Sequence, residues 1–310
     1  MNRRDALTTL AGGAALALAG PPARAAENTG HIAVPGGKVW YRTVGHGPKT
    51  PLLLLHGGPG AAHDYLLPLR ALADERPVIF YDQLGCGRSD APDEDAPYHI
   101  GRFVDEIDAV RQALGLDRLM LYGHSWGAML AIEYFVAGRG QGVEKLILGG
   151  ASASTPQFVA GTRRLIEAMP HGAGARLLAL DAAGTTDTPE YRKLVQAFYD
   201  RYLLRVKPSP EFLASGRALE KSPAYRIMNG PNEFTVTGNI KDWERRADLG
   251  AIRVPTLLLT SQYDEVTLDC HETIRDAVPG SVLKILPNAS HLAMQERPGA
   301  YTAVVRRFLA

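Results

Sequence analysis

The chain has 310 residues, and 45% of them are apolar, which is enough for one large domain with a buried core. Its 34 basic residues nearly balance its 33 acidic residues, so the charge gives no reason to expect a nucleic-acid partner. The two cysteines, Cys86 and Cys270, lack the spacing of a metal site. An exported protein could pair them, but their elements are expected to lie far apart, which argues against a disulfide.

The first 25 residues have the features of a signal peptide. Arg3-Arg4 precede an uncharged apolar stretch, 6–19, and Ala23-Arg24-Ala25 has the small residues of a cleavage site. The stretch is too short to span a bilayer. The paired arginines indicate twin-arginine export, although Asp5, the residue after them, departs from that signal. A Sec signal, a retained anchor and a leader without an export role remain as alternatives. We expect a periplasmic or secreted protein with no stable membrane insertion after cleavage.

Strand-like runs recur along the chain at intervals that helices can fill. The runs 32–34 and 39–41 flank Pro35-Gly36-Gly37 and predict a hairpin. The run 52–55 is apolar throughout, as expected for a strand buried on both faces, and 103–114 has helical periodicity. This alternation predicts a mostly parallel sheet with helices on both faces. The further predicted strands are 78–81, 119–122, 146–148, 256–259 and 282–286.

The alternation stops between residues 152 and 240. This stretch has proline and glycine breaks but no run typical of a buried strand. Helices are predicted at 158–169, 176–180, 191–204 and 211–219. We interpret 152–240 as a helical cap inserted between two parts of the sheet domain, 26–151 and 241–310.

The most informative motif is Gly123-His124-Ser125-Trp126-Gly127, which has the pattern G-x-S-x-G. A predicted strand precedes it, and the run 128–135 that follows has helical character. A strand, a sharp turn and a helix together form a nucleophile elbow, and the glycines keep side chains away from Ser125. A chance glycine-serine turn is the alternative, which the flanking elements disfavour. An aspartate-nucleophile dehalogenase or epoxide hydrolase is disfavoured because the elbow holds a serine.

A serine nucleophile needs a base within hydrogen-bond reach and an acid that orients the base. With a nucleophile elbow, the chain order is serine, then Asp or Glu, then His. Asp264 lies in the loop after the predicted strand 256–259, and His291 follows the last predicted strand. We therefore predict that Ser125, Asp264 and His291 form a catalytic triad.

Other acids and histidines near these positions are weaker candidates. Asp269 lies close to the acid loop, whereas Asp248 precedes the strand. His271 is expected in a helix, where a solvated surface position is more consistent with its surroundings than a role as base. His124 stands beside the nucleophile and is expected to pack within the elbow.

An oxyanion hole needs two backbone N–H groups that point at the developing charge. Trp126, the residue after the nucleophile, is predicted to provide one of them. The second is expected from His56-Gly57-Gly58-Pro59-Gly60, the loop after the third predicted strand. Pro59 has no N–H, and glycines let the backbone approach a substrate, so we predict Gly58 as the second donor. A glycine loop without function is the alternative.

Three motifs together resemble the prolyl aminopeptidases (proline iminopeptidases) of the α/β-hydrolase fold. They are H-G-G-P-G at 56–60, Y-D-Q-L-G-C-G-R-S at 81–89 and G-H-S-W-G at 123–127. M-N-G-P-N-E-F at 228–234 and Y-D-E-V-T at 263–267 are similar to the subgroup of the tricorn-interacting aminopeptidase. The resemblance covers the chain from about residue 29 onward. It implies an α/β-hydrolase fold with a mostly parallel eight-stranded sheet and an inserted helical cap.

The resemblance also implies an activity. It implies release of an N-terminal residue, proline or another apolar residue, from short peptides through an acyl-enzyme, without cofactor or metal. Acidic residues of the cap and of the acid loop bind the substrate's free amino group in the family, and these correspond to Glu233 and Glu265. A partly buried ammonium needs opposite charge to offset its desolvation. The alternative is that both glutamates are surface or cap-anchoring acids.

Several alternatives remain after the resemblance. Amidases that hydrolyse amino-acid amides, including proline amide, belong to the same branch, and the motifs do not separate them from peptidases. Ala128 stands where the family often has a second glycine, and many relatives lack an export signal. A carboxylesterase or lactonase would have no amine for Glu233 and Glu265. A non-catalytic ligand-binding protein of the same fold is disfavoured by the triad and the glycine loop. The sequence indicates neither the preferred residue nor the oligomeric state.

Overall fold

The computed structural model describes residues 27–93, 95 and 98–310. The predicted signal peptide, 1–25, lies outside these residues, and its role stays a prediction. Among the helices that the structure describes, none is long and apolar enough to cross a membrane.

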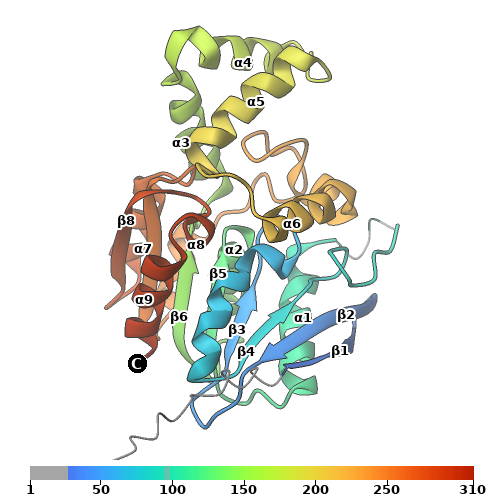
Figure 1. Cartoon of the computed structure of the whole chain (residues 1–310), viewed down its shortest axis with the longest axis vertical. Helices are drawn as coiled ribbons and strands as arrows, with labels where there is room; N and C mark the ends of the chain where they lie inside the picture. Colours follow the sequence, from blue (N-terminus) through green and yellow to red (C-terminus); the bar gives the residue numbers. More distant parts are fainter. Residues whose placement is uncertain (1–26, 94, 96–97) are drawn as a thin grey trace, which may run out of the picture.

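An eight-stranded sheet forms the centre of the molecule (Figure 1). Its strands are β1 (Glu27–Val34), β2 (Gly37–Val44), β3 (Leu52–Leu55), β4 (Val78–Tyr81), β5 (Leu119–His124), β6 (Val143–Gly149), β7 (Thr256–Tyr263) and β8 (Val282–Ser290). They lie in the order β1-β2-β4-β3-β5-β6-β7-β8. The pairs β1–β2 and β2–β4 are antiparallel, and all other neighbouring pairs are parallel. The predicted mostly parallel sheet and the predicted hairpin are therefore confirmed.

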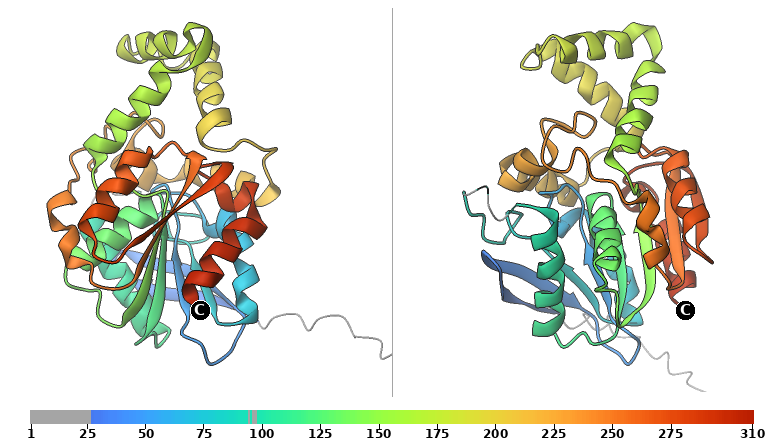
Figure 2. Two further views of the ribbon diagram at one scale, coloured as in Figure 1. Left: turned by 90° about the vertical axis from the view of Figure 1, so that its left-hand side faces the viewer. Right: turned by 180° about the vertical axis from the view of Figure 1, so that it is seen from behind.

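Helices cover both faces of this sheet (Figure 2). The α-helices are α1 (Ile100–Ala113), α2 (Trp126–Val136), α3 (Thr155–Glu167), α4 (Ala173–Ala182), α5 (Pro189–Tyr202), α6 (Pro210–Lys221), α7 (Leu268–Ala277), α8 (Ala293–Glu296) and α9 (Pro298–Leu309). One apolar cluster joins α1, α2 and α7 to the sheet, and a second joins the 3-10 helix η1 (His63–Asp74), α8 and α9 to its other face. Burial on both faces explains why β3 consists only of leucines.

Four α-helices, α3 to α6, lie in the chain between β6 and β7, and α3, α4 and α5 project away from the sheet (Figure 1). These three helices share an apolar cluster of their own, which consists of Ile166, Met169, Leu177, Leu180, Tyr191, Phe198 and Phe234. By contrast, α6 packs against η1, where Ser215 Oγ donates to the carbonyl of Ala62 at 2.8 Å. The segment between β6 and β7 thus contains one self-packed group of helices and one helix, α6, that packs on the sheet domain.

Local start signals explain where the helices of this segment begin. Ser154, Thr188 and Ser209 each accept a hydrogen bond from the backbone N–H three residues later, at the beginning of α3, α5 and α6. A proline stands in the first turn of each of these helices, where its missing N–H costs no helical hydrogen bond.

The chain enters and leaves this helical segment at one place. Ser154 and Glu244 form an antiparallel bridge. The N–H of Thr155 donates to the carbonyl of Trp243 at 2.9 Å, and Ser154 Oγ donates to Glu244 at 2.8 Å. The two connections to the sheet therefore lie side by side at the base of the segment.

Candidate active site

Ser125 lies in the sharp turn between β5 and α2. Its φ of 55° and ψ of −123° are unusual for a residue with a side chain and are typical of a strained nucleophile elbow. The neighbouring glycines are sterically required. A Cβ at Gly127 would lie 2.1 Å from the carbonyl O of Leu55, and one at Gly123 would lie 2.2 Å from that of Gly127. The close approach of β3, β5 and α2 thus determines both glycines of the motif.

The structure brings the three predicted triad residues to one edge of the sheet. Asp264 follows β7 and His291 follows β8, the neighbouring parallel strand, so their side chains meet. His291 Nδ1 lies 2.7 Å from Asp264 Oδ1. Ser125 and His291 line the same cavity. No hydrogen bond joins these two side chains in the described part of the chain, and such bonds are often long before substrate binds.

The charges of the Asp264–His291 pair follow from burial and mutual attraction. Burial alone would raise the pKa of Asp264, but the charge and hydrogen bond of His291 hold it below its usual range. Burial opposes the charged form of His291, yet Asp264 and nearby carboxylates raise its pKa to about 9. Thr260 Oγ1 and the N–H of Val266 also donate to Asp264, at 3.0 and 2.9 Å. Asp264 is therefore a fixed acceptor that directs the Nδ1–H of His291 to itself and leaves Nε2 for proton transfer.

Both predicted oxyanion donors border a cavity at Ser125 that is smaller than the one Ser125 shares with His291. Gly58 and Trp126 line it together. Gly58 has a φ of 118°, and a Cβ there would lie 2.4 Å from the N of Gly60, so the loop conformation requires a glycine. Trp126 is the first residue of α2, where backbone N–H groups have no partner within the helix. Such groups are suited to stabilise negative charge that develops beside Ser125.

A polar chain that the sequence did not reveal connects the glycine loop to His291. The N–H of Gly57 donates to Tyr65 Oη at 2.8 Å, and Tyr65 Oη lies 3.0 Å from His124 Nδ1. His124 Nε2 lies 3.1 Å from the carbonyl O of His291. Because a carbonyl only accepts, Nε2 carries the hydrogen and Nδ1 accepts from Tyr65. Burial lowers the pKa of His124 to about 3, in agreement with a neutral ring.

Glu233 and Glu265 are two acids beside this machinery. Glu265 is 1% exposed, and its Oε1 lies 3.8 Å from His291 Nε2. Its Oε2 is buried without a hydrogen-bond partner among the described residues. Glu233 is half-buried, accepts a hydrogen bond from Tyr225 Oη at 3.0 Å and borders the cavity of Ser125. Burial raises the pKa of both glutamates, and their mutual repulsion further raises that of Glu265.

No lysine or arginine of the described chain forms an ion pair with either glutamate. The charge of His291 is already paired with Asp264, so two further carboxylates without a lysine or arginine partner are costly at this site. A ligand with a positive charge would offset that cost. The two glutamates therefore favour a ligand that places a cationic group close to Ser125.

Two cavities meet at Ser125, and Glu233 and Gly58 border both. The smaller has a volume of about 40 Å³ and contains Trp126. Its apolar walls are Met129, Phe158, Val236, Ile240 and Val266. The larger, of about 100 Å³, contains His291. Its apolar walls are Leu203, Phe212, Leu219 and Leu292.

Of the weaker sequence candidates, Asp248, Asp269 and His271 lie outside both cavities, whereas His124 lines the larger one. The expectation that His271 is solvated was wrong, because it is buried on α7 and its Nε2 accepts a backbone N–H of the loop after β6 at 2.9 Å. Asp269 is an exposed partner of a cap arginine, and Asp248 lies at the surface. Cys86 and Cys270 are both buried and unpaired.

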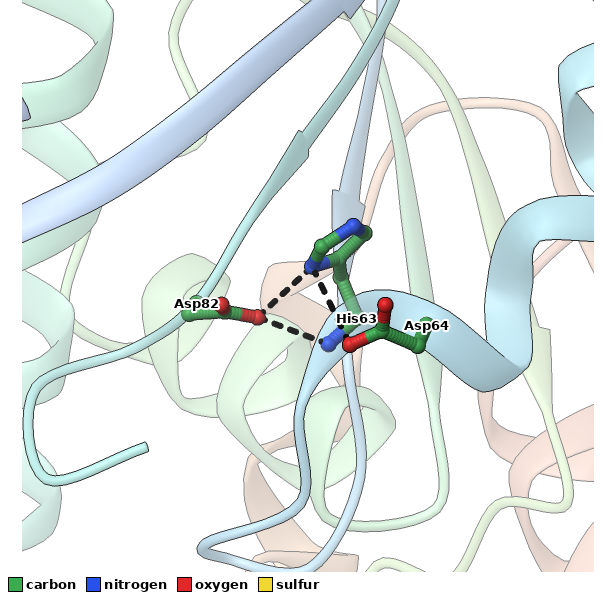
Figure 3. A group of neighbouring side chains, drawn as sticks. All are labelled: His63, Asp64 and Asp82. Carbon is green, nitrogen blue, oxygen red and sulfur yellow. Dashed lines mark hydrogen bonds and ion pairs between the residues drawn. The ribbon is translucent and has the colours of Figure 1, made fainter. Parts of the chain in front are cut away.

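A second cluster of polar residues lies where η1 begins and β4 ends, and it contains side chains of the types that bind metals. Figure 3 shows His63, Asp64 and Asp82, from the start of η1 and the end of β4. Asp82 Oδ1 accepts from the N–H and Nδ1 of His63 at 2.8 and 2.7 Å, and Oδ2 accepts from the N–H of Arg88 at 3.0 Å. The Arg88 guanidinium donates to Asp64 at 3.1 and 3.2 Å. Because protein donors already occupy these carboxylates, we interpret the cluster as the anchor of loop 82–89.

Comparison with known proteins agrees with this architecture. Residues 50–298 match the family described as alpha/beta hydrolase fold. The chain is 41% identical over 266 residues to a proline iminopeptidase of Saccharolobus solfataricus, covering 85% of this chain and 86% of the relative. It is 37% identical over 284 residues to a proline iminopeptidase of Thermoplasma volcanium, covering 90% and 96%.

Two solved structures are similar in both fold and sequence. The crystal structure of VinJ has a TM-score of 0.86 and 36% identity, and the alignment covers 91% of this chain and 98% of VinJ. The crystal structure of a proline iminopeptidase from Mycobacterium smegmatis has a TM-score of 0.84 and 34% identity, covering 91% and 97%.

Proposed function

Because the chain belongs to the proline iminopeptidase family of α/β hydrolases, we infer that it is a serine aminopeptidase. We propose that it releases an N-terminal proline or another small apolar residue from short peptides or amino-acid amides. The observation that carries this proposal is the pair of acids beside Ser125 and His291, the half-buried Glu233 and the buried Glu265, with which no lysine or arginine of the described chain is paired.

The geometry supports acyl transfer in two steps. Ser125 Oγ attacks the substrate carbonyl carbon while His291 Nε2 takes its proton, and His291 then donates that proton to the leaving amine. Asp264 holds the imidazole ring and stabilises its charged form. The N–H groups of Gly58 and Trp126 stabilise the oxyanion. Water then attacks the acyl-enzyme with His291 again as base.

The two glutamates would restrict the substrate to one with a free amine. An ammonium between them gains opposite charge on both sides, whereas an acylated amine leaves both acids unpaired. The ammonium would also lower the pKa of His291, because it neutralises carboxylates that stabilise the imidazolium. Substrate binding would thus make the base available at neutral pH. The acid limb of the kcat profile should therefore lie at lower pH than the acid limb of the kcat/KM profile.

The two cavities indicate how the substrate would lie. The cavity with Trp126 and an apolar lining suits the side chain of the acyl residue, and its volume of about 40 Å³ favours a small apolar group such as the proline ring. His291 donates a proton to the leaving amine, so the cavity that His291 lines would receive that amine.

The proposal is tested by Glu233→Gln, assayed on an aminoacyl amide and on a simple acyl ester. A charge-assisted hydrogen bond contributes roughly 1.5–3 kcal/mol, so kcat/KM for the amine substrate should fall about 10- to 100-fold. The ester has no ammonium to lose and should not be slowed. Glu272→Gln, a change of the same kind on the exposed side of α7, is the matched control.

Two further readouts belong to the same experiment. N-acetylated substrates should be poor, and kcat/KM for amines should show a falling alkaline limb that the ester lacks, because the α-amino group, with a pKa near ~8, loses its proton. Equal slowing of amine and ester by Glu233→Gln, or turnover of N-acetylated substrates, would favour a carboxylesterase or lactonase instead. Absence of labelling of Ser125 by a fluorophosphonate probe would favour a non-catalytic ligand-binding protein.

We also propose that the protein acts outside the cytoplasm. The leader supports this proposal through Arg3-Arg4, the apolar stretch 6–19 and the Ala23-Arg24-Ala25 site. Its substrates would then be peptides or amides of the periplasm or the medium.

A further inference from the structure

We propose that a cleft between α5 and α6 binds the leaving portion of the substrate, and that Gly216 keeps this cleft open to Ser125. The inference rests on the proposed function and concerns its leaving group. The cleft, called here the outer cleft, has a volume of about 630 Å³, far more than the cavity of about 100 Å³ that contains Ser125 and His291. Its lining residues run from Gln196 on α5 to Glu233 after α6.

The outer cleft is continuous with the cavity of the catalytic residues. The residues that line both are Leu203, Phe212, Gly216, Leu219 and Glu233. His291 lies in the inner cavity and must deliver a proton to the leaving amine. A chain attached to that amine therefore starts beside His291 and continues past these shared residues into the outer cleft.

Gly216 stands at the junction of the two spaces. It lies inside α6, and with Phe212 and Leu219 it has the spacing of residues on one helix face. A Cβ at Gly216 would meet no atom within 4 Å, so close packing does not require a glycine. Its backbone is not in the left-handed region, so no turn requires one either. Glycine weakens a helix relative to alanine, so its presence inside α6 needs a reason. The space that it leaves free between the two cavities is the reason that remains.

The walls of the outer cleft indicate which leaving groups it would take. Val206 and Leu213 are 45% and 47% exposed, although most large apolar side chains of the described chain are buried. Asp200, Arg217 and Glu220 add charges of both signs. The cleft thus offers apolar contact without a single electrostatic preference. This suits a peptide with an apolar residue after the scissile bond, whereas the ammonia released from an amide would leave the cleft unused.

The test is a length series with the N-terminal residue held constant: an aminoacyl amide, then a dipeptide, a tripeptide and a tetrapeptide with leucine after the scissile bond. In the wild type, kcat/KM should rise from the amide to the longer peptides. Gly216→Leu should lower the ratio of kcat/KM for tetrapeptide over amide by about tenfold or more, because the added side chain fills the passage. Gly216→Ala should lower the ratio in the same direction by a smaller factor and should raise the melting temperature.

Gly299→Leu is the matched control. Gly299 lies in the first turn of α9, outside both spaces, and a Cβ there also meets no atom within 4 Å. It should leave the ratio unchanged. The inference is overturned if Gly216→Leu leaves the ratio of kcat/KM for tetrapeptide over amide unchanged. If Gly216→Leu does not fold, an unchanged ratio in Gly216→Ala overturns it. If the proposed function itself is wrong, the wild-type enzyme will show no preference for substrates with a free amine. The same length series can then be run with esters of longer alcohols.

Discussion

The buried carboxylate of Glu265 should determine the pH at which His291 loses its proton. Glu265→Gln keeps the size of the side chain and removes its charge. Because a negative charge stabilises the imidazolium, its removal should lower the pKa of His291 from about 9. The acid limb of kcat/KM should therefore move to lower pH in the variant.

The size of this shift can be bounded from the structure. Glu265 Oε1 and His291 Nε2 are 3.8 Å apart. At an effective dielectric constant of about 20, two unit charges at this distance interact by roughly 4 kcal/mol. Glu265 has a raised pKa and so carries only part of a charge near pH 8, which reduces the effect. We expect a shift of at least about one pH unit, which corresponds to about 1.4 kcal/mol.

The assay should use a simple ester, because an amine substrate titrates in the same range. Initial rates from pH 5 to 10 would give the acid limb for the wild type, for Glu265→Gln and for the exposed control Glu272→Gln. The control should superimpose on the wild type. An acid limb of Glu265→Gln that stays in place, or moves to higher pH, would show that Glu265 does not act on His291 as the 3.8 Å separation implies.

Three further results are expected. Ser125→Ala should lower kcat by several orders of magnitude with an unchanged circular-dichroism spectrum, because triad members act as a unit, and activity within about tenfold of the wild type would refute the assignment. Tyr65→Phe leaves the Gly57 N–H and His124 Nδ1 unpaired, so urea unfolding should show a loss of about 1–3 kcal/mol and kcat should fall more than KM changes. The mature protein should begin near Ala26, and mass spectrometry that finds intact Met1 on cytoplasmic protein would contradict export.

Much of the site could be predicted because its parts are local. The elbow at Ser125 needs only a strand, a turn and a helix that are consecutive in the chain. Asp264 and His291 could be placed because each follows a strand, and parallel neighbours bring such positions to one edge. The structure places all three together, and β7 and β8 pair side by side as this reasoning requires.

Other features depend on contacts that no local pattern reveals. Tyr65 and His124 are 59 residues apart, and neither the spacing nor the type of Tyr65 indicates their hydrogen bond. His271 has a helical surface pattern, but the backbone of the loop after β6 covers it. The strand 282–286 proved longer, because pairing with β7 extends β8 to Ser290 despite Asn288 with a φ of 54°.

The side-by-side connections at Ser154 and Glu244 have a consequence for how such enzymes diversify. Because the intervening segment starts and ends at one point, a change in the length of its α3 to α5 part need not displace the strands on either side, and the entropy of closing the chain varies only slowly with the segment's length. Its helices α3 to α5 bring their own apolar cluster, so they do not depend on the sheet for burial. Insertions, deletions and recombination can therefore remodel the substrate-facing wall over evolutionary time while the elbow and its partners stay under separate selection.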